Sequence, residues 1–332
     1  MSSLDLVEHP VTRATHTAEM EVELDRLDRT VTKSIDFTQV PDDRAREIDE
    51  EINLVWNLDQ PEVGSVLHIR LAPDPLLNAA PCDAVVYSPK APTNGLIFFI
   101  HGGGWAFCNL RTHERFMRVL CNQTGRTVVG VHYRLAPEHP YPAALHDVVS
   151  AFRTVLATRD DLGLPRGPVV VAGDSAGGNL ALALILHELE AGHQLPVGGL
   201  LFYGVFGREF DTPSYKVYAE GELLTTDVMQ RLWQWYDPDG TAYRDPLAVP
   251  LRASDEQLKK LPPLFLLSAE MDPLTSDTIN LKRRLDALGR SDELWIEPGV
   301  IHGFLQMTAT LHAARQATSR AAEAANRFIS EG

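Results

Sequence analysis

The stretch VVVAGDSAGGNLALALIL, residues 169–186, joins a short apolar strand to an apolar helix through Gly-Asp-Ser-Ala-Gly. A G-x-S-x-G motif between a strand and a helix is typical of a tight turn that holds its serine hydroxyl above the end of a sheet. Glycines flank the serine because a Cβ at either position would crowd the neighbouring strand or helix. The start of the helix also carries partial positive charge, which favours a developing anion. We therefore interpret Ser175 as a nucleophile, the alternative being a purely structural turn.

Eight β-rich runs lie along the chain from about Ser65, and the motif ends the fifth of them. They read SVLHIRL, DAVVYS, LIFFI, TVVGVHY, PVVVAGD, GLLFYGV, PLFLLSA and DELWIEP. Helical patterns follow the early runs, over residues 113–124, 142–158, 177–191, 276–288 and 309–328. Apolar strands that alternate with helices predict an α/β fold, with a mostly parallel eight-stranded sheet and helices on both faces. The first strands follow one another without a helix, so we expect an antiparallel meander at the start.

Two segments interrupt this alternation and predict a helical cap. Residues 1–60 are acid-rich, and their apolar residues recur at helical spacing: Met20, Leu24, Leu27 and Val31, then Ile48, Ile52 and Val55. These helices either pack on the edge of a domain or form a lid over a site. Roughly sixty residues after GLLFYGV contain a further expected helix with Leu223, Leu224, Met229, Leu232, Trp233 and Tyr236. We expect an α/β domain over 61–206 and 251–332, with cap segments 1–60 and 207–250.

Composition and charge exclude several classes of protein. A formal net charge of −15 would repel nucleic acid and an anionic membrane surface. No run reaches the roughly 20 apolar residues of a membrane span, and the N-terminus lacks the features of a signal peptide. Cys82, Cys108 and Cys121 form no CxxC pair, and HExxH is absent, so we expect no metal and no cofactor. A cytoplasmic location with reduced thiols is the expectation.

A serine nucleophile needs a base and an acid that orients it, and both are expected in loops after late strands. Asp272 follows the run PLFLLSA, and His302 follows the run DELWIEP. Their positions, at the ends of consecutive strands, make them the candidate acid and base. Glu270 lies near the same strand end and is the competing candidate for the acid.

The stretch FFIHGGGWAF, residues 98–107, places three glycines directly after an early strand. Attack on a carbonyl creates an oxyanion, and backbone N–H groups of such a loop stabilise it. A phosphate cradle and a packing turn are the alternatives. Neither the GKS or GKT of a Walker loop nor a GxGxxG that opens a helix is present.

The motifs HGGGW, GDSAGG, DPL and IHGF occur in this order, and the chain resembles the bacterial hormone-sensitive-lipase-like esterases of the α/β-hydrolase fold. The segment YRLAPEHPYPAA at 133–144 is also similar to that family, and the resemblance runs from about residue 65 to the end. It implies a serine carboxylesterase for small to medium esters, with Ser175, His302 and Asp272 as catalytic triad. It also implies oxyanion donors at Gly103, Gly104 and Ala176.

The resemblance further implies that His101 and the segment 133–138 are structural. A buried Arg134 then needs a carboxylate partner, for which Asp147 and Glu138 are the candidates. Many relatives have Gly followed by Ser or Asp where this chain has Cys108-Asn109, which leaves the shape of the pocket open. Ser276 and Asp277 replace the usual second Asp after the DPL motif, a change expected to affect only a helix cap.

Aromatic residues of the glycine loop and the insertion are candidate pocket residues: Trp105, Phe107, Trp233, Trp235 and Tyr236. A small-molecule ester is the expected partner, and the family implies a homodimer through the last strand. Two rival functions remain at this point. One is an amidase or acyltransferase with the same triad, and the other is a ligand-binding protein, against which the presence of His302 argues.

Overall fold

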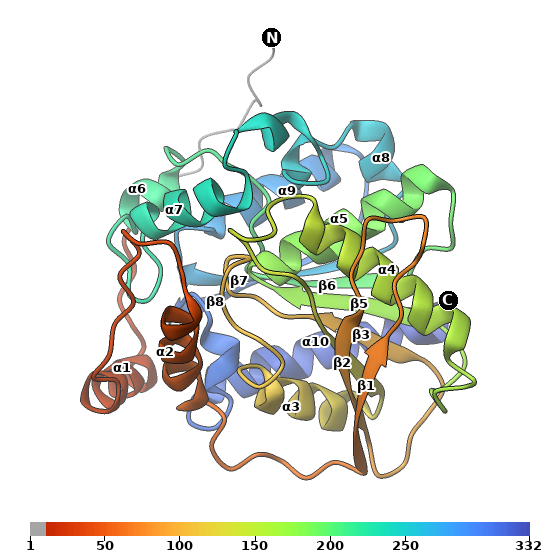
Figure 1. Ribbon diagram of the computed structural model, residues 1–332. Helices are drawn as coiled ribbons and strands as arrows, with labels where there is room; N and C mark the ends of the chain where they lie inside the picture. Colours follow the sequence, from red (N-terminus) through yellow and green to blue (C-terminus); the bar gives the residue numbers. More distant parts are fainter. Residues whose placement is uncertain (1–10) are drawn as a thin grey trace.

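The eight apolar runs form the strands of one sheet in the computed structural model, which describes residues 11–332 (Figure 1). The strands are β1 (Ser65–Leu71), β2 (Cys82–Ser88), β3 (Leu96–Ile100), β4 (Thr127–His132), β5 (Val169–Asp174), β6 (Gly198–Phe202), β7 (Leu264–Met271) and β8 (Glu293–Ile301). The expected α/β fold with an eight-stranded sheet is therefore confirmed. The first ten residues of the expected cap segment 1–60 lie outside the described residues.

The strand order is β1-β2-β4-β3-β5-β6-β7-β8. The pairs β1–β2 and β2–β4 are antiparallel and all the other pairs are parallel, so β2 runs opposite to the other seven strands. The expected opening meander is limited to the pair β1 and β2. β3 does not continue it, because the chain crosses over through a helix and β4 takes the place beside β2. The mostly parallel sheet directs the carboxyl ends of β3 to β8 to one edge, where loops can meet.

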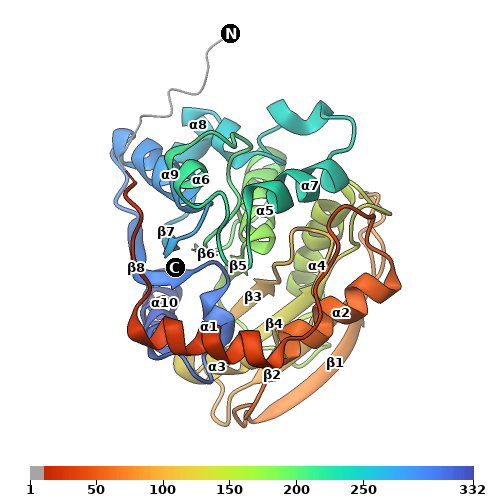
Figure 2. The same cartoon turned by 90° about the vertical axis from the view of Figure 1, so that its left-hand side faces the viewer.

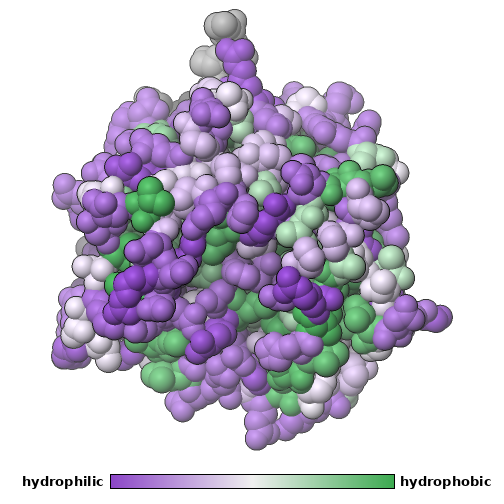
Figure 3. All heavy atoms as spheres, in the orientation of Figure 1, coloured by the Kyte–Doolittle hydropathy of each residue, from purple (hydrophilic) through white to green (hydrophobic). Residues whose placement is uncertain are grey.

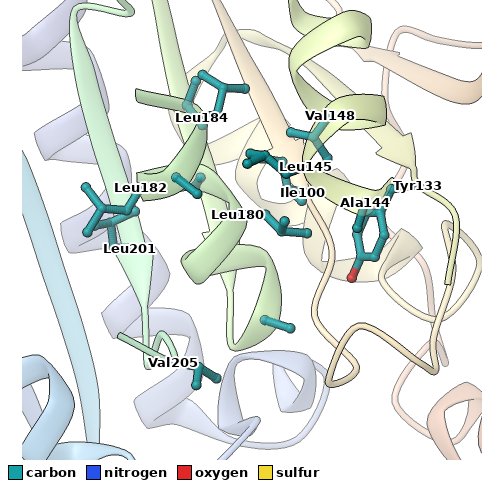
Figure 4. Close-up of a cluster of buried hydrophobic side chains, with 14 of the residues drawn as sticks. Ile100, Tyr133, Ala144, Leu145, Val148, Leu180, Leu182, Leu184, Leu201 and Val205 are labelled. Atoms are coloured by element: carbon teal, nitrogen blue, oxygen red, sulfur yellow. The ribbon is translucent and has the colours of Figure 1, made fainter. Parts of the chain in front are cut away.

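Helices cover both faces of the sheet because successive side chains of a buried strand point to opposite sides. Phe98 of β3 belongs to the cluster under α4 (Ala143–Thr158), α5 (Ala176–Ala191) and α9 (Thr275–Ala287). Phe99, its neighbour in the strand, belongs to the cluster under α3 (Glu114–Thr124) and α10 (His312–Glu331). Figure 4 shows part of the first cluster, with leucines of α5 next to residues of α4 and to Leu201 of β6.

Four further helices lie around the carboxyl ends of the strands (Figure 2). They are α1 (Ala18–Thr30), α2 (Asp43–Leu54), α6 (Pro213–Val217) and α7 (Thr226–Tyr236). The side chains of Thr17, Asp42 and Thr225 accept hydrogen bonds from backbone N–H groups and cap α1, α2 and α7. Leu223 and Leu224, expected inside the helix of the insertion that contains Met229 and Trp233, instead precede α7.

Short helical turns follow α7. They are the 3₁₀ turns Thr241–Arg244 and Pro250–Arg252 and the helix α8 (Asp255–Lys259), and a further 3₁₀ turn, Phe304–Met307, follows β8. The face of the molecule in Figure 3 is mostly polar, with apolar side chains in separate patches. Within residues 11–332, no helix is both long and apolar enough to cross a membrane.

Candidate active site

Ser175 occupies the turn between β5 and α5 with φ 54° and ψ −121°. A conformation of this kind costs a non-glycine residue about 1–3 kcal/mol and needs support from its surroundings. The Ser175 N–H donates to the carbonyl of Phe202 at 2.9 Å and provides part of that support. A Cβ on Gly173 would collide with the carbonyl of Gly177, and one on Gly177 would collide with the carbonyl of Ile100. Neither glycine of the motif can therefore be replaced by a residue with a Cβ without a steric clash with the backbone.

His302 lies between the serine and a buried carboxylate. Its Nε2 is 3.0 Å from Ser175 Oγ, and its Nδ1 is 2.7 Å from Asp272 Oδ2. A carboxylate only accepts hydrogen bonds, so Nδ1 carries the proton and Nε2 is free to accept the serine proton. Asp272 is fully buried, and its second oxygen accepts the N–H of Leu274 at 2.8 Å. This fixes the carboxylate that holds the imidazole.

Glu270, the competing candidate for the acid, does not contact His302. Its Oε2 accepts the N–H of Gly299 at 2.8 Å, within the neighbouring strand β8. Tyr203, which the sequence did not single out, packs edge-on against the imidazole of His302 with ring centres 4.9 Å apart. Tyr203 directly follows β6. This position at a strand end is the only feature of the sequence that could have pointed to it as a residue of the site.

The glycine loop follows β3 and leaves two backbone donors without partners. The N–H groups of Gly103 and Gly104 donate to no other described residue. Both residues have positive φ, 106° and 57°, and both line the same pocket as Ser175. The N–H of Ala176, in the first turn of α5, has no partner within the helix. The N–H groups of the three expected oxyanion donors are therefore unpaired within the described residues, and Gly103 and Gly104 line the same pocket as the nucleophile.

Asp174, the residue before the serine, holds the start of the glycine loop. Its Oδ1 accepts the N–H of Gly102 at 2.9 Å. Its carboxylate also lies 3.2 Å from His113 Nε2, at the start of α3. A Cβ on Gly102 would lie only 2.7 Å from Asp174 Oδ2, so this glycine is needed for the contact.

His101 has the structural environment that the resemblance implies. Burial lowers its pKa well below the ordinary value, so the ring is neutral. Its Nδ1–H donates to the carbonyl of Gly102 at 2.8 Å, and its Nε2 accepts from His132 at 2.9 Å. The ring stacks on Tyr133, whose hydroxyl donates to the carbonyl of His101 at 2.9 Å.

Arg134 pairs with Asp147 and not with Glu138. Two guanidinium nitrogens of Arg134 each donate to an oxygen of Asp147 at 2.8 Å. Glu138 instead pairs with Arg46 of α2 at 2.6 Å. The second candidate carboxylate therefore joins the α/β domain to the cap.

A pocket of about 330 Å³ opens above the serine. Ser175, His302, Gly103 and Gly104 line its base. Apolar side chains from α2, α7 and the segments that precede them form its walls: Val31, Ile35, Phe37, Ile52, Leu223, Leu224, Val228, Met229 and Leu232, together with Phe107 of the glycine loop. Both cap segments thus contribute to one pocket.

Most of the aromatic candidates lie outside this pocket, which corrects the expectation for Trp105, Trp233, Trp235 and Tyr236. The ring of Trp105 stacks on Tyr236 at 4.3 Å and lies 4.8 Å from Trp233, and all three are buried. Through these three rings, the glycine loop packs against the side of α7 that faces the core. Trp235 packs against Phe37 and Phe107. Only Phe107 of the candidates lines the pocket.

The two departures from the family pattern also have structural partners. Asp277 Oδ2 accepts the N–H groups of Phe206 and Gly207 at 3.0 and 2.7 Å, and Ser276 exchanges hydrogen bonds with Ser214. They anchor the insertion, which corrects the expectation of a change in a helix cap. Cys108 has φ 63°, a conformation in which glycine carries no penalty. Burial raises the pKa of its thiol well above the ordinary range, so Cys108 is not a competing nucleophile.

Comparison with known proteins agrees with this geometry. A family model described as the alpha/beta hydrolase fold matches residues 97–306. The chain belongs to this family. Among alpha/beta hydrolases, it is 36% identical to a carboxylesterase, NlhH, of Mycobacterium tuberculosis over 248 residues, which cover 74% of this chain and 77% of that protein.

Solved structures of the alpha/beta hydrolase fold extend the likeness to almost the whole chain. The ester hydrolase EH1AB1 from the metagenome of Lake Arreo has a TM-score of 0.87 and 29% identity, and the match covers 95% of this chain and 100% of that chain. That enzyme was solved with a derivative of bipyridine phosphonate. A thermostable esterase from Pseudomonas putida has a TM-score of 0.87 and 28% identity, over 96% and 99% of the two chains. The expected resemblance to hormone-sensitive-lipase-like esterases is confirmed.

Proposed function

We propose that the protein is a serine carboxylesterase that hydrolyses small to medium carboxylic esters through an acyl-enzyme on Ser175. The observation that carries the proposal is the chain of contacts from Ser175 Oγ to His302 Nε2, 3.0 Å, and from His302 Nδ1 to Asp272 Oδ2, 2.7 Å. The names of the similar proteins, carboxylesterase and esterase, support ester hydrolysis in preference to amide hydrolysis or acyl transfer.

In the acylation step, Ser175 Oγ attacks the ester carbonyl carbon while His302 Nε2 takes the serine proton. The carbonyl oxygen becomes an oxyanion, which the N–H groups of Gly103, Gly104 and Ala176 stabilise. Asp272 holds the imidazole in the required tautomer and stabilises its positive charge. The imidazolium then gives its proton to the leaving alcohol, and an acyl-serine ester remains.

In the deacylation step, His302 takes a proton from water, and the resulting hydroxide attacks the acyl carbon. The same N–H groups stabilise the second oxyanion. Collapse of this intermediate returns the proton to Ser175 and releases the carboxylic acid. Every proton in the cycle passes through His302, so no cofactor is required by the proposed reaction.

The pocket supports the proposed size of the ester. Its volume of about 330 Å³ lies near the lower end of ligand pockets, which range over roughly 300–1,000 Å³. Its apolar walls favour an uncharged acyl chain over a charged one because burial of a charge is costly.

The Ser175→Ala variant tests the proposal with p-nitrophenyl butyrate as substrate. Removal of the nucleophile is expected to lower kcat by at least about a thousand-fold. Ser330→Ala, at an exposed position of α10, is the matched control and should keep wild-type turnover. Retention of most of the activity by Ser175→Ala would contradict the proposal. Turnover of a p-nitroanilide, or transfer to added alcohol in place of hydrolysis, would assign an amidase or acyltransferase instead.

The proposed assembly is a homodimer through β8, and the proposed location is the cytoplasm. Within the described residues, β8 is an edge strand that pairs only with β7, and an edge strand can pair with a second copy. Cys82, Cys108 and Cys121 carry free thiols, which fits a reducing compartment. Light scattering on the purified protein and cell fractionation test these two points.

A further inference from the structure

The cap helix α2 is bound directly to the outer part of the glycine loop. Asp49 Oδ2 accepts the backbone N–H of Cys108 at 2.9 Å, and Glu50 Oε2 accepts the side-chain N–H of Asn109 at 2.8 Å. Arg46 Nε donates to the carbonyl of Ala106 at 3.1 Å. These three residues of α2 stand at spacings that share one face of a helix. One helix face therefore contacts the loop at residues 106, 108 and 109.

The loop has different supports at its two ends. Its beginning is held by the α/β domain, through Asp174 at Gly102. Near its other end, the N–H of Cys108 has no acceptor in the described residues other than Asp49. Asn53, one helical turn further along α2, donates to Asp49 Oδ1 at 3.0 Å and fixes the carboxylate. At Cys108 the loop is thus held by the cap, whereas the backbone of the next residue, Asn109, is bound to Thr112 of the α/β domain.

The loop also needs external support because part of its backbone is strained. Trp105 and Cys108 have φ 60° and 63°, values that cost a non-glycine residue about 1–3 kcal/mol each and persist only where the surroundings enforce them. Cys108 is not a glycine, so its positive φ carries this strain. The bond from Asp49 meets the backbone at this strained residue.

Cys108 is in contact with Gly103, one of the expected oxyanion donors. The loop folds back on itself, and the N–H groups of Ala106 and Phe107 donate to the carbonyl of Gly103. A Cβ built on Gly103 would lie 2.8 Å from Cys108 Cβ, so the two residues are in direct contact. A displacement of Cys108 therefore changes the orientation of Gly103, which lines the pocket and whose N–H has no acceptor in the described residues.

We propose that α2 positions the oxyanion hole, with Asp49 as a positioning residue that acts on Gly103 through Cys108. This inference rests on the proposed esterase function, in which Gly103 stabilises the oxyanion. It gives the N-terminal cap a second role beside its apolar wall: the hole has its active geometry only while α2 is docked. In the contact between loop and cap, Cys108 is the hydrogen-bond partner of Asp49, and Asn109 is the partner of Glu50.

The test compares Asp49→Ala with Asp49→Asn on p-nitrophenyl butyrate. The alanine variant is expected to lower kcat by about 10- to 100-fold, because misplaced donors act on the transition state, with KM changed less than about threefold. An asparagine oxygen still accepts the Cys108 N–H, so Asp49→Asn should recover most of the loss. Glu47→Ala, on the exposed side of α2, where Glu47 forms an ion pair with Arg44, is the control and should match wild type.

Inhibitor binding separates positioning from a merely structural effect. Butyl trifluoromethyl ketone forms a tetrahedral adduct with an oxyanion on the serine, whereas butyramide binds without one. Asp49→Ala should lower the affinity for the ketone by the same factor as it lowers kcat/KM, and it should leave the affinity for butyramide nearly unchanged. The pocket variant Ile52→Ala should instead raise KM and weaken both inhibitors, because Ile52 lines the wall but makes no bond to the loop.

Wild-type kcat in Asp49→Ala, or an equal loss for both inhibitors, overturns the proposal. If Asp49→Ala does not fold, as judged by circular dichroism, Glu50→Ala is tested in its place. It should lower kcat and the affinity for the ketone by about three- to tenfold and leave the affinity for butyramide nearly unchanged. Failure of the esterase proposal is recognised separately, because Ser175→Ala would then stay active.

Discussion

At the scale of single residues, Asp174 joins the two parts of the site that must stay aligned. It precedes the nucleophile in the chain, and its side chain accepts the N–H of Gly102 in the glycine loop. The residue is buried, so this bond is not exchanged for one with solvent. A single carboxylate thus ties the start of the glycine loop to the residue that precedes the nucleophile.

Replacement of Asp174 by alanine is expected to lower kcat by about 10- to 100-fold with little change in KM. Loss of the acceptor frees Gly102, and the donors at Gly103 and Gly104 lose their alignment with Ser175. Asp174→Asn keeps an oxygen for the Gly102 N–H and should lie between the alanine variant and wild type. Steady-state kinetics with p-nitrophenyl butyrate measures both. A loss confined to KM would show that Asp174 does not orient the donors.

The residues of the serine turn could be predicted from the sequence, whereas those of the pocket wall could not. The motif at Ser175 is local, since the strand, both glycines and the helix lie within one stretch, and His302 and Asp272 follow from chain order. Trp233 and Val228 both belong to a broad apolar face of α7. Periodicity shows that such a face is buried but not which part faces the core and which faces a cavity.

At the scale of elements, α7 has two apolar contacts of different kinds. Trp233 and Tyr236 pack on Trp105 in the core. Leu232 points to the pocket and packs so closely on Gly104 that a Cβ there would collide with its methyl groups. One side of the helix therefore supports the glycine loop, and the adjacent side limits the space above it.

Leu232→Ala is expected to widen the pocket next to Gly104. The ratio of kcat/KM for a branched ester, p-nitrophenyl pivalate, to that for the butyrate should rise by about 10-fold, since methyl groups in such a pocket are worth about 1–3 kcal/mol. The variant should also lose about 2–5 kcal/mol of stability, as for other buried leucines. Gln230→Ala, at an exposed position of the same helix, is the control. An unchanged ratio would mean that Leu232 does not limit the acyl group.

The existence of the elements could be predicted, but their pairing could not. All eight strands and the main helices follow from local periodicity, and their bounds differ from the expected ones by a few residues. The contact of Asp49 and Glu50 with Cys108 and Asn109 joins residues far apart in the chain. Without the fold, an acidic residue in an acid-rich helix is indistinguishable from one that only faces solvent.

At the scale of the whole molecule, the insertion is tied to the α/β domain by buried polar groups. Asp277 of α9 accepts two backbone N–H groups where the chain leaves β6 for the insertion. Burial raises the pKa of Asp277 to about 7 despite these bonds, and the nearby carboxylate of Glu209 also raises it.

This carboxyl group gives the folded protein a stability that decreases as pH rises. Its pKa is about 7 in the folded state and about 3.8 in the unfolded chain, so between these values the folded state binds the extra proton. Its contribution is favourable near pH 4 and is lost progressively up to about pH 7. Asp49, with its pKa raised by burial to about 6, acts in the same direction.

Asp277→Asn removes the proton linkage at this site while keeping an oxygen for the N–H groups of Phe206 and Gly207. The variant should match the wild type in stability near pH 4 and exceed it at pH 8, by an amount on the order of a few kcal/mol. Urea unfolding at the two pH values, followed by circular dichroism, measures the difference. Asp286→Asn, on the same helix but exposed, controls for the loss of one negative charge. An equal effect of Asp277→Asn at both pH values would show that Asp277 is ionised throughout, and its two N–H donors would then outweigh its burial.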